Sequence, residues 1–234
     1  MLRIDNREPL DLRNLKITPN AMPFAEGSCQ IDLGDTRVLC TATVEERVPS
    51  WMKGKGAGWL TGEYAMLPRS GRDRNERDRL KPNGRTIEIQ RLIGRSLRAV
   101  VDLERLGERT IILDCDVIGA DGGTRCASIT GAYVALALAV ENLGLNKKLI
   151  THQIAAVSVG VIQGDPILDL CYHEDSKADV DMNVVALSDG RYVEVQGTAE
   201  GTPYDRIMLN RLLDVAQVGL DVLFAAQRIA IEGK

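Results

Sequence analysis

Apolar residues recur at three- and four-residue steps in several long segments, which predicts amphipathic helices. The first helix is expected from about residue 85 to Gly107, with an apolar stripe opposite a face of arginines and acids and the glycine as its C-terminal stop. A second is expected over residues 124–143, closed by Gly144. Small residues inside this second helix predict that a neighbouring backbone approaches it closely.

A strand, turn, strand pattern occurs twice. Residues 29–40 and 157–168 each alternate apolar and polar positions around a Gly-Asp pair, which predicts two hairpins. A later strand follows each hairpin, at residues 109–116 and 191–196, and each leads through a glycine-rich turn into a helix. The last helix is expected over about residues 203–229, with a Thr-Pro pair placing proline at the first helical position.

This repeated order predicts an α+β fold. We expect one domain spanning residues 1–234, built as two related β/α halves of about residues 1–145 and 151–234, with helices packed on mixed sheets. A chain of 234 residues is long enough to bury a substantial core.

Composition narrows the class of protein. The chain is 44% hydrophobic and 26% charged, as in ordinary globular proteins, and no apolar run approaches the ~20 residues of a membrane span. The N-terminus lacks a secretory segment, so we expect a cytoplasmic protein with no membrane contact. Five scattered cysteines without CxxC spacing argue against disulfides and zinc, and predict small buried side chains. With two histidines, chemistry must rely on carboxylates, arginines and a metal ion where one is needed.

Charge is unevenly distributed. The net charge is −4, yet residues 69–98 hold ten basic and four acidic side chains, so this stretch carries +6 and the rest −10. Its first part, residues 69–83, has no apolar periodicity and predicts a charged loop, or an arm ordered against a partner. Two interpretations remain open for its arginines: a solvated surface loop, or a contact with nucleic acid.

Two predicted helices begin with glycine and arginine, as GRT at residues 84–86 and GGTR at residues 122–125. Helix N-termini attract anions, and a guanidinium can grip two phosphate oxygens. Arginine there opposes the helix dipole, so Arg85 and Arg125 call for anionic partners. The alternative is that each pairs with a nearby acid such as Asp121.

Four carboxylates lie within residues 174–181, ahead of a predicted strand. On an extended chain Asp179 and Asp181 share one face, and Asp175 can fold back beside them. Carboxylates held this close suit Mg²⁺, which takes its other ligands from water and phosphate, or one can act as a general acid. The alternative is an acidic turn without chemistry.

Seven motifs follow one another along the chain: AEGS (25–28), GDTRVLC (34–40), EYAMLP (63–68), EIQRLIGRSLR (88–98), DGGTR (121–125), DSKADVDMN (175–183) and EVQGTAE (194–200). In this order they resemble the ribonuclease PH family of phosphate-dependent 3′ exoribonucleases. Two positions depart from the family pattern, since glycine is expected at Asn6 and threonine or serine at Cys126.

The resemblance implies a fold of two related β/α halves and a hexameric ring, a trimer of dimers. It implies phosphorolysis of RNA 3′ ends, chiefly of tRNA precursors, in a reversible reaction that releases nucleoside diphosphates. By match to the family motifs, inorganic phosphate is held by Arg85, Gly123, Thr124 and Arg125. Asp175 and Asp181 fall on the acidic positions that serve Mg²⁺ and the leaving group, with metal ligand and general acid both open for Asp181. RNA would be bound from neighbouring subunits by Arg69, Arg72, Arg74, Arg77 and Arg79.

Two rival functions belong to other classes. One is a non-catalytic RNA-binding ring subunit of an exosome-like assembly, which would not need the arginines and the carboxylates together. The other is a small-molecule kinase, which also uses glycine-rich helix starts.

Overall fold

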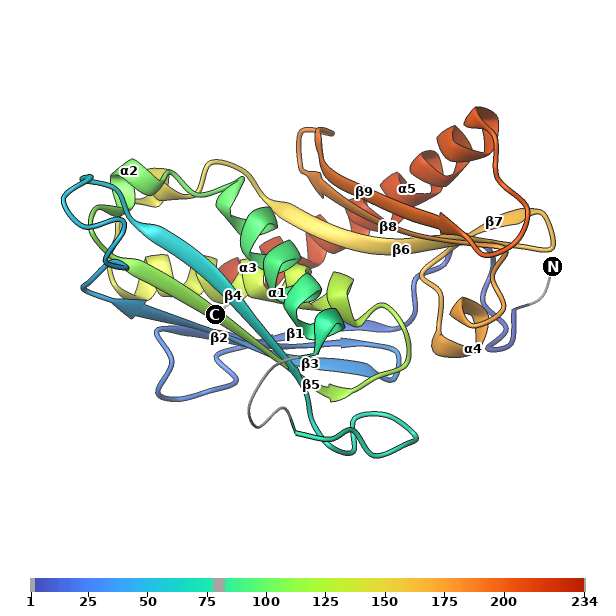
Figure 1. Ribbon diagram of the computed structural model, residues 1–234, viewed down its shortest axis with the longest axis horizontal. Coiled ribbons are helices and arrows are strands. Elements are labelled where there is room, and N and C mark those ends of the chain that lie inside the picture. The colour runs from blue at the N-terminus through green and yellow to red at the C-terminus, as the bar shows by residue number, and fades with distance from the viewer. Residues whose placement is uncertain (1–2, 78–82, 234) are drawn as a thin grey trace.

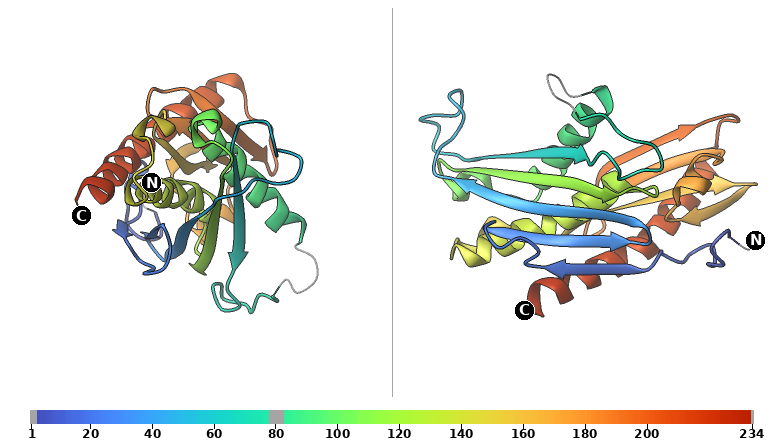
Figure 2. Two further views of the ribbon diagram at one scale, coloured as in Figure 1. Left: turned by 90° about the vertical axis from the view of Figure 1, so that its left-hand side faces the viewer. Right: turned by 90° about the horizontal axis from the view of Figure 1, so that it is seen from below.

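The computed structural model describes residues 3–77 and 83–233, whose strands form two sheets (Figure 1). The first sheet is mixed, because β4 runs parallel to β5 and the other pairs are antiparallel. Its spatial order is β1-β2-β3-β5-β4, seen from below in Figure 2, with β1 Leu15–Pro19, β2 Gly27–Leu33, β3 Thr36–Glu45, β4 Trp59–Met66 and β5 Thr110–Gly119.

The second sheet is antiparallel, in the order β7-β6-β8-β9. Its strands are β6 Ile154–Ile162, β7 Asp165–Leu168, β8 Val180–Leu187 and β9 Tyr192–Ala199. The helices are α1 Gly84–Arg98, α2 Leu103–Leu106, α3 Thr124–Asn142, the 3-10 turn η1 Lys147–Leu149, α4 Tyr172–Asp175 and α5 Arg206–Glu232. These two sheets with packed helices confirm the predicted α+β class; the boundaries of the two halves, at residues 1–145 and 151–234, stay a prediction.

Helix α3 is the centre of the core and packs against both sheets. Its small residues allow the predicted close approach, because a Cβ added to Gly27 on β2 would lie 2.1 Å from the carbonyl oxygen of Ala135. On its other side, the Thr130 hydroxyl accepts from the amide of Ala156 on β6, at 3.1 Å. Gln227 of α5 then donates to the carbonyls of Thr130 and Ile154 at 3.0 and 2.9 Å. The first residues of α3 are thereby fixed between the two sheets.

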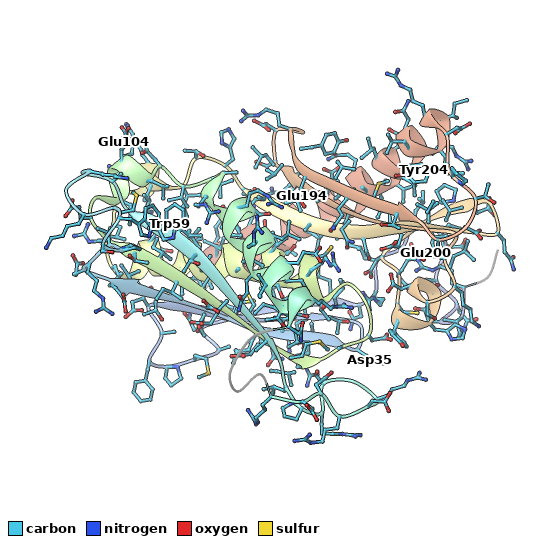
Figure 3. All side chains as sticks on the ribbon, viewed as in Figure 1. Asp35, Trp59, Glu104, Glu194, Glu200 and Tyr204 are labelled. Carbon is cyan, nitrogen blue, oxygen red and sulfur yellow. The ribbon has the colours of Figure 1, made fainter. Side chains whose placement is uncertain are left out.

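Helix α1 packs on β4 beside the first sheet. Arg98 donates to the carbonyl of Leu60 at 2.9 Å, and its guanidinium lies 4.6 Å from the ring centre of Trp59. Nε of Arg95 donates to Glu194 of β9, at 2.9 Å. Trp59 and Glu194 are labelled in Figure 3. Helix α1 therefore contacts β4 of the first sheet and β9 of the second.

Both predicted hairpins are present. Leu33 pairs with Thr36 across the Gly-Asp turn, in which Gly34 has φ +58°. The second hairpin differs by one position, because Gln163 and Gly164 form the turn with φ +53° and +85°, which places Asp165 in β7 rather than in the turn.

Two predicted helix boundaries are wrong. The first helix ends at Arg98 instead of continuing to Gly107, because backbone groups of Val100 and Asp102 bond to the chain at 149–151. A separate short helix, α2, then reaches Gly107. The last helix starts at Arg206, because the Asp205 carboxylate accepts from the amide of Met208 at 2.8 Å and caps it.

The cysteine prediction is confirmed, since all five thiols are free and buried. None of the helices in residues 3–77 and 83–233 combines the length and the apolar run needed to span a bilayer.

Candidate active site

A cavity of about 540 Å³ opens where the β5–α3 loop meets the first turn of α1, helix α4 and strand β8. Its lining contains every residue that the family resemblance assigns to phosphate or metal, namely Arg85, Gly123, Thr124, Arg125, Asp175 and Asp181. These residues are up to 96 positions apart in the sequence and come from helices α1, α3 and α4, the β5–α3 loop and strand β8.

The β5–α3 loop depends on two glycines. Gly122 and Gly123 have φ of +80° and +65°, a region that side chains disfavour. A Cβ on Gly122 would lie 2.6 Å from the carbonyl oxygen of Leu170, so this loop also needs a residue without a side chain. Helix α3 has no side-chain cap, and its first amides are suited to an anion.

The start of α1 behaves differently from the prediction. The Asn83 side chain accepts from the amide of Thr86 at 2.9 Å and so caps this helix. Of the two helix starts expected to bind an anion through their amides, α3 alone keeps an uncapped terminus. Helix α1 contributes the exposed Arg85 side chain to the cavity instead.

Arg125 is held by two polar side chains. Its Nη1 donates to Gln196 at 2.9 Å and lies 3.5 Å from a carboxylate oxygen of Glu88, which accepts from the Gln196 amide at 3.0 Å. The acid beside Arg125 is therefore Glu88. Asp121 lies 3.7 Å from Arg13.

The two carboxylates predicted to be catalytic, Asp175 and Asp181, come from α4 and β8. Burial and the neighbouring charge of Asp181 raise the pKa of Asp175, while the charges of Arg85, Arg125 and Arg13 oppose that rise. The carboxyl of Asp175 is therefore within electrostatic reach of both cavity arginines.

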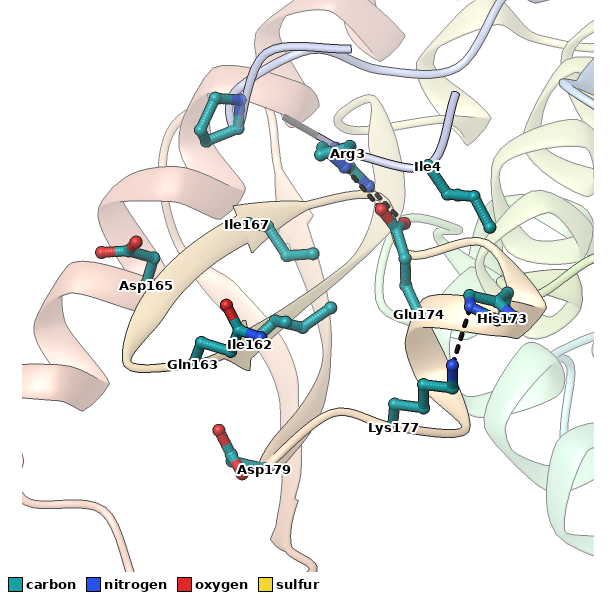
Figure 4. A pocket seen from close by; sticks show the side chains of 11 residues that line it. Arg3, Ile4, Ile162, Gln163, Asp165, Ile167, His173, Glu174, Lys177 and Asp179 are labelled. Carbon is teal, nitrogen blue, oxygen red and sulfur yellow. Dashed lines mark hydrogen bonds and ion pairs between the residues drawn. The ribbon is translucent and has the colours of Figure 1, made fainter. Parts of the chain in front are cut away.

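Asp179 does not join this pair, contrary to the prediction. It precedes β8 and lines a second cavity on the far side of α4, together with Lys177 (Figure 4). Strand alternation cannot be extended to it because pairing in β8 begins at Val180. Asp175 also sits at the end of a short helix rather than on a loop.

No group of three or more His, Cys, Asp or Glu side chains in the described ranges is arranged to hold a metal ion. Mg²⁺ is commonly bound through one or two carboxylates with water and substrate phosphate completing its shell. Asp175 and Asp181 fit that mode of binding, and do not form a complete protein cage.

The arginine-rich loop lies beside the cavity. Arg69, Arg72, Arg74 and Arg77 are exposed, and Arg72 lines the cavity, whereas Arg79 lies outside the described residues. The base of the loop is fixed, because the amide of Ala120 donates to the carbonyl of Ser70 at 2.8 Å, next to the β5–α3 loop.

Sequence reasoning missed the side chains beneath the cavity. Arg13, Thr36 and Asp169 are buried under the β5–α3 loop and bond to one another or to its backbone. Arg13 and Asp169 lie outside the seven motifs, and Thr36 lies inside GDTRVLC (34–40) but was given no role there. The two departures from the family pattern are accommodated: Asn6 has φ +63°, a conformation that asparagine tolerates better than most residues, and the Cys126 thiol donates to Asn183 at 3.1 Å. Burial raises the pKa of Cys126 to about 12, so it stays a neutral thiol.

Known proteins resemble this chain along its whole length. The 3′ exoribonuclease family matches with its domain 1 over residues 11–140 and its domain 2 over residues 152–219. The curated protein Ribonuclease PH of Synechococcus sp. (strain CC9605) is 55% identical over 232 residues, covering 97% of this chain and 94% of its own length.

Solved structures share the fold at low identity. A structure of the Archaeoglobus fulgidus exosome with RNA bound to the active site superposes with a TM-score of 0.77 at 22% identity, over 99% of this chain and 92% of its own. Rice (Oryza sativa) Rrp46 superposes with a TM-score of 0.76 at 19% identity, over 96% of this chain and 100% of its own.

Proposed function

Because this chain belongs to the 3′ exoribonuclease family, we propose that it shortens RNA from the 3′ end by phosphorolysis. The chain is a phosphate-dependent 3′-5′ exoribonuclease, a tRNA nucleotidyltransferase, that transfers the terminal nucleotide to inorganic phosphate. The observation that carries this conclusion is the near-full-length match to a relative named Ribonuclease PH. The cavity contains the side chains that such a reaction needs.

Inorganic phosphate is the nucleophile, so the protein needs no activated serine, cysteine or histidine. An oxygen of the phosphate attacks the phosphorus of the last linkage, the bond from that phosphorus to the 3′ oxygen breaks, and the 3′ oxygen takes up a proton. The products are a nucleoside diphosphate and an RNA one nucleotide shorter. The main obstacle is the mutual repulsion of two anions.

Arg85, Arg125 and the first amides of α3 bind the attacking phosphate and neutralise its charge. This assignment is supported by their common place in the cavity and by the uncapped start of α3. Holding the nucleophile in one orientation converts an encounter of two anions into a reaction within one complex.

Asp175 and Asp181 serve the leaving group at the opposite wall. The two carboxylates would hold Mg²⁺, which would supply positive charge to the reaction. Burial, and after it the neighbouring charge of Asp181, raise the pKa of Asp175, which favours a cation or a proton at this carboxyl. Asp181 acts either as a metal ligand or as the acid that protonates the 3′ oxygen.

RNA is bound by Arg69, Arg72, Arg74 and Arg77, with Arg79 predicted in the same role. A ring of six subunits, a trimer of dimers, is part of this proposal, as are tRNA precursors as the chief RNA. A cytoplasmic location stays a prediction. The rival of a non-catalytic ring subunit is disfavoured because the cavity contains both the arginines and the carboxylates.

The test uses a tRNA that carries a short 3′ extension, incubated with Mg²⁺ in the presence and absence of inorganic phosphate. We expect the RNA to be shortened only when phosphate is present, and we expect nucleoside diphosphates as the released product. The Asp181→Asn variant is the negative control. Equal shortening without phosphate, or release of monophosphates, would contradict the proposed function.

A further inference from the structure

Arg13 is a buried arginine for which the mechanism above has no use. It lies just before β1, and 5% of its surface is exposed. Its Nε and Nη2 donate to the two carboxylate oxygens of Asp169 at 2.9 and 2.7 Å, and its own amide donates to the same carboxylate at 2.8 Å. Burial alone would lower the pKa of Arg13, but Asp169 raises it above the ordinary value, so the guanidinium stays charged.

The other edge of this guanidinium holds the loop that begins α3. Nη1 of Arg13 donates to the carbonyl of Asp121, and Nη2 donates to the carbonyl of Gly122 at 3.4 Å. The Thr36 hydroxyl donates to the same Gly122 oxygen at 2.6 Å and accepts from the amide of Asp121 at 3.0 Å. In a trans peptide the carbonyl and the following amide point in opposite directions, so the Gly123 amide points away from Arg13.

Asp169 connects Arg13 to the segment that carries Asp175. It is fully buried and has φ +53°, an uncommon conformation for a residue with a side chain, which persists where the surroundings hold it. Its amide donates to the carbonyl of Ser158 at 2.7 Å. Its carbonyl accepts from Arg3 at 2.8 Å, so the backbone is fixed on both sides.

The chain from Asp169 to Asp175 also touches the glycine loop directly. A Cβ on Gly122 would lie 2.9 Å from the amide nitrogen of Tyr172, and that amide bonds to the Asp121 carboxylate at 3.3 Å. On the far side of α4, Arg3 pairs with both oxygens of Glu174 at 2.8 and 2.6 Å (Figure 4). The position of Asp175 relative to the glycine loop is therefore set by buried ionic contacts.

We propose that Arg13, paired with Asp169, is a positioning residue that sets the spacing between the phosphate-binding loop and the Asp175 carboxylate. This inference rests on the proposed function, because it assigns Arg13 a role toward the phosphate bound there. Arg13 bridges the two walls between which the reacting groups lie, and touches no reacting atom itself. A misplacement of about 1 Å at such a site can cost on the order of 100-fold in rate.

The first test is Arg13→Lys, assayed by steady-state release of nucleoside diphosphate while phosphate and RNA are varied separately. Lysine keeps the charge but cannot bond to both Asp169 oxygens and both loop carbonyls at once. We expect KM for phosphate to rise about 10-fold and kcat to fall by about 10- to 100-fold, with KM for RNA within twofold of wild type. A merely structural role would lower the folded fraction and the apparent kcat, and leave KM for phosphate unchanged.

The second variant guards against misfolding of the first. Thr36→Val keeps the buried shape, removes the hydroxyl that holds Gly122 and Asp121, and leaves the Arg13–Asp169 pair intact. We expect KM for phosphate to rise about 3- to 10-fold, since one of the two supports of the loop remains. The matched control is Arg37→Lys, which alters an exposed arginine–aspartate pair with Asp32 on the same hairpin and should leave every constant within twofold.

Two results would overturn the inference. In the first, wild type releases nucleoside diphosphates and both Arg13→Lys and Thr36→Val keep the wild-type KM for phosphate. If the lysine variant does not fold, an unchanged KM in Thr36→Val alone counts in the same way. The positioning role is then wrong and the proposed function stands. If wild type itself releases no nucleoside diphosphate, both are wrong.

Discussion

Arg125 lies at the start of α3. Its side-chain partners do not fully neutralise its positive charge. Glu88 is 3.5 Å away and half exposed, and Gln196 is uncharged. Replacing Arg125 with alanine should lower kcat/KM for phosphate by about 100- to 1000-fold, the usual loss when one charged stabilising contact is removed. RNA binding should change little. Nucleoside diphosphate release and RNA retention on a filter measure the two effects separately.

The control for this substitution is Arg91→Ala, which removes an exposed arginine of α1 outside the cavity. Full phosphorolysis by Arg125→Ala would show that the anion is held elsewhere.

Asp175 opposes folding at neutral pH. Burial and the charge of Asp181 raise its pKa in the folded state, so the native protein binds a proton more tightly than the unfolded chain does. Stability is then greatest below the ordinary pKa and decreases as pH rises through the raised value. Asp175→Asn should therefore raise Tm at pH 7 by roughly 2–4 °C, the shift that 1 kcal/mol produces in a chain of this length, while phosphorolysis is lost.

The gain in Tm should shrink as pH falls toward the ordinary pKa of an aspartate, because a growing share of the wild-type carboxyl is then protonated, and thermal melts across this range measure it. Asp189→Asn is the control, and its change in Tm should have the opposite sign. A hydrogen bond from Arg191 lowers the pKa of Asp189, so losing this carboxylate should lower Tm. A lower Tm for Asp175→Asn at pH 7 would be inconsistent with repulsion between the two cavity carboxylates.

In the β5–α3 loop, the backbone conformation and the space around Gly122 both require glycine. Gly122 and Gly190 have similar φ, +80° and +87°, but a Cβ on Gly122 would lie 2.6 Å from Leu170, whereas one on Gly190 would meet open space. Gly190→Ala should cost about 1–2 kcal/mol of stability, the cost of the left-handed conformation. Gly122→Ala should cost about 1–3 kcal/mol more for the steric clash and should also weaken phosphate binding. Urea denaturation and the KM for phosphate should be measured for both glycine variants. An equal loss of stability in the two would contradict the close approach of Gly122 to Leu170.

The proposed contact between the arginine-rich loop and RNA depends on charge. Replacing Arg72, Arg74 and Arg77 with alanine should weaken RNA binding evenly across sequences and reduce the slope of log K against log salt by about 2, at roughly 0.7 per phosphate contact with single strands. Affinity measured over a salt series tests this prediction. The matched control replaces three exposed, ion-paired arginines elsewhere, Arg47, Arg105 and Arg191. An unchanged slope in the loop variant would mean that the loop does not contact RNA phosphates.

At the scale of the whole molecule, the chain exposes several large apolar side chains. Phe24 is 96% exposed, and Ile207 and Ile229 on α5 are 71% and 72% exposed. Apolar side chains that gather in a large exposed patch commonly mark an interaction surface. Light scattering after size exclusion should give six times the chain mass of 25.6 kDa, as expected for the proposed ring. A mass of one chain at micromolar concentration would contradict the ring.

The helices, the hairpins and the phosphate motif could be predicted because each depends on neighbours close in sequence. Helix boundaries were less predictable, since Val100 and Asp102 leave the helical path to bond with residues 149–151. The same limit applied to Asp179, whose side chain was expected beside Asp181 but lies in another cavity. Long-range hydrogen bonds decided each of these positions, and a periodic pattern carries no record of them.

By itself, the sequence determined the α+β class, the family and the residue types that handle phosphate, because apolar periodicity, glycine turns and motif order are local properties of the chain. The tertiary structure decided which of these residues share a cavity and what holds them there. It left α3 uncapped while Asn83 capped α1, gave Arg125 its partners Glu88 and Gln196, and buried Arg13 against Asp169 beneath the glycine loop. Those contacts join residues up to 156 positions apart, and only the folded chain brings them within hydrogen-bonding distance.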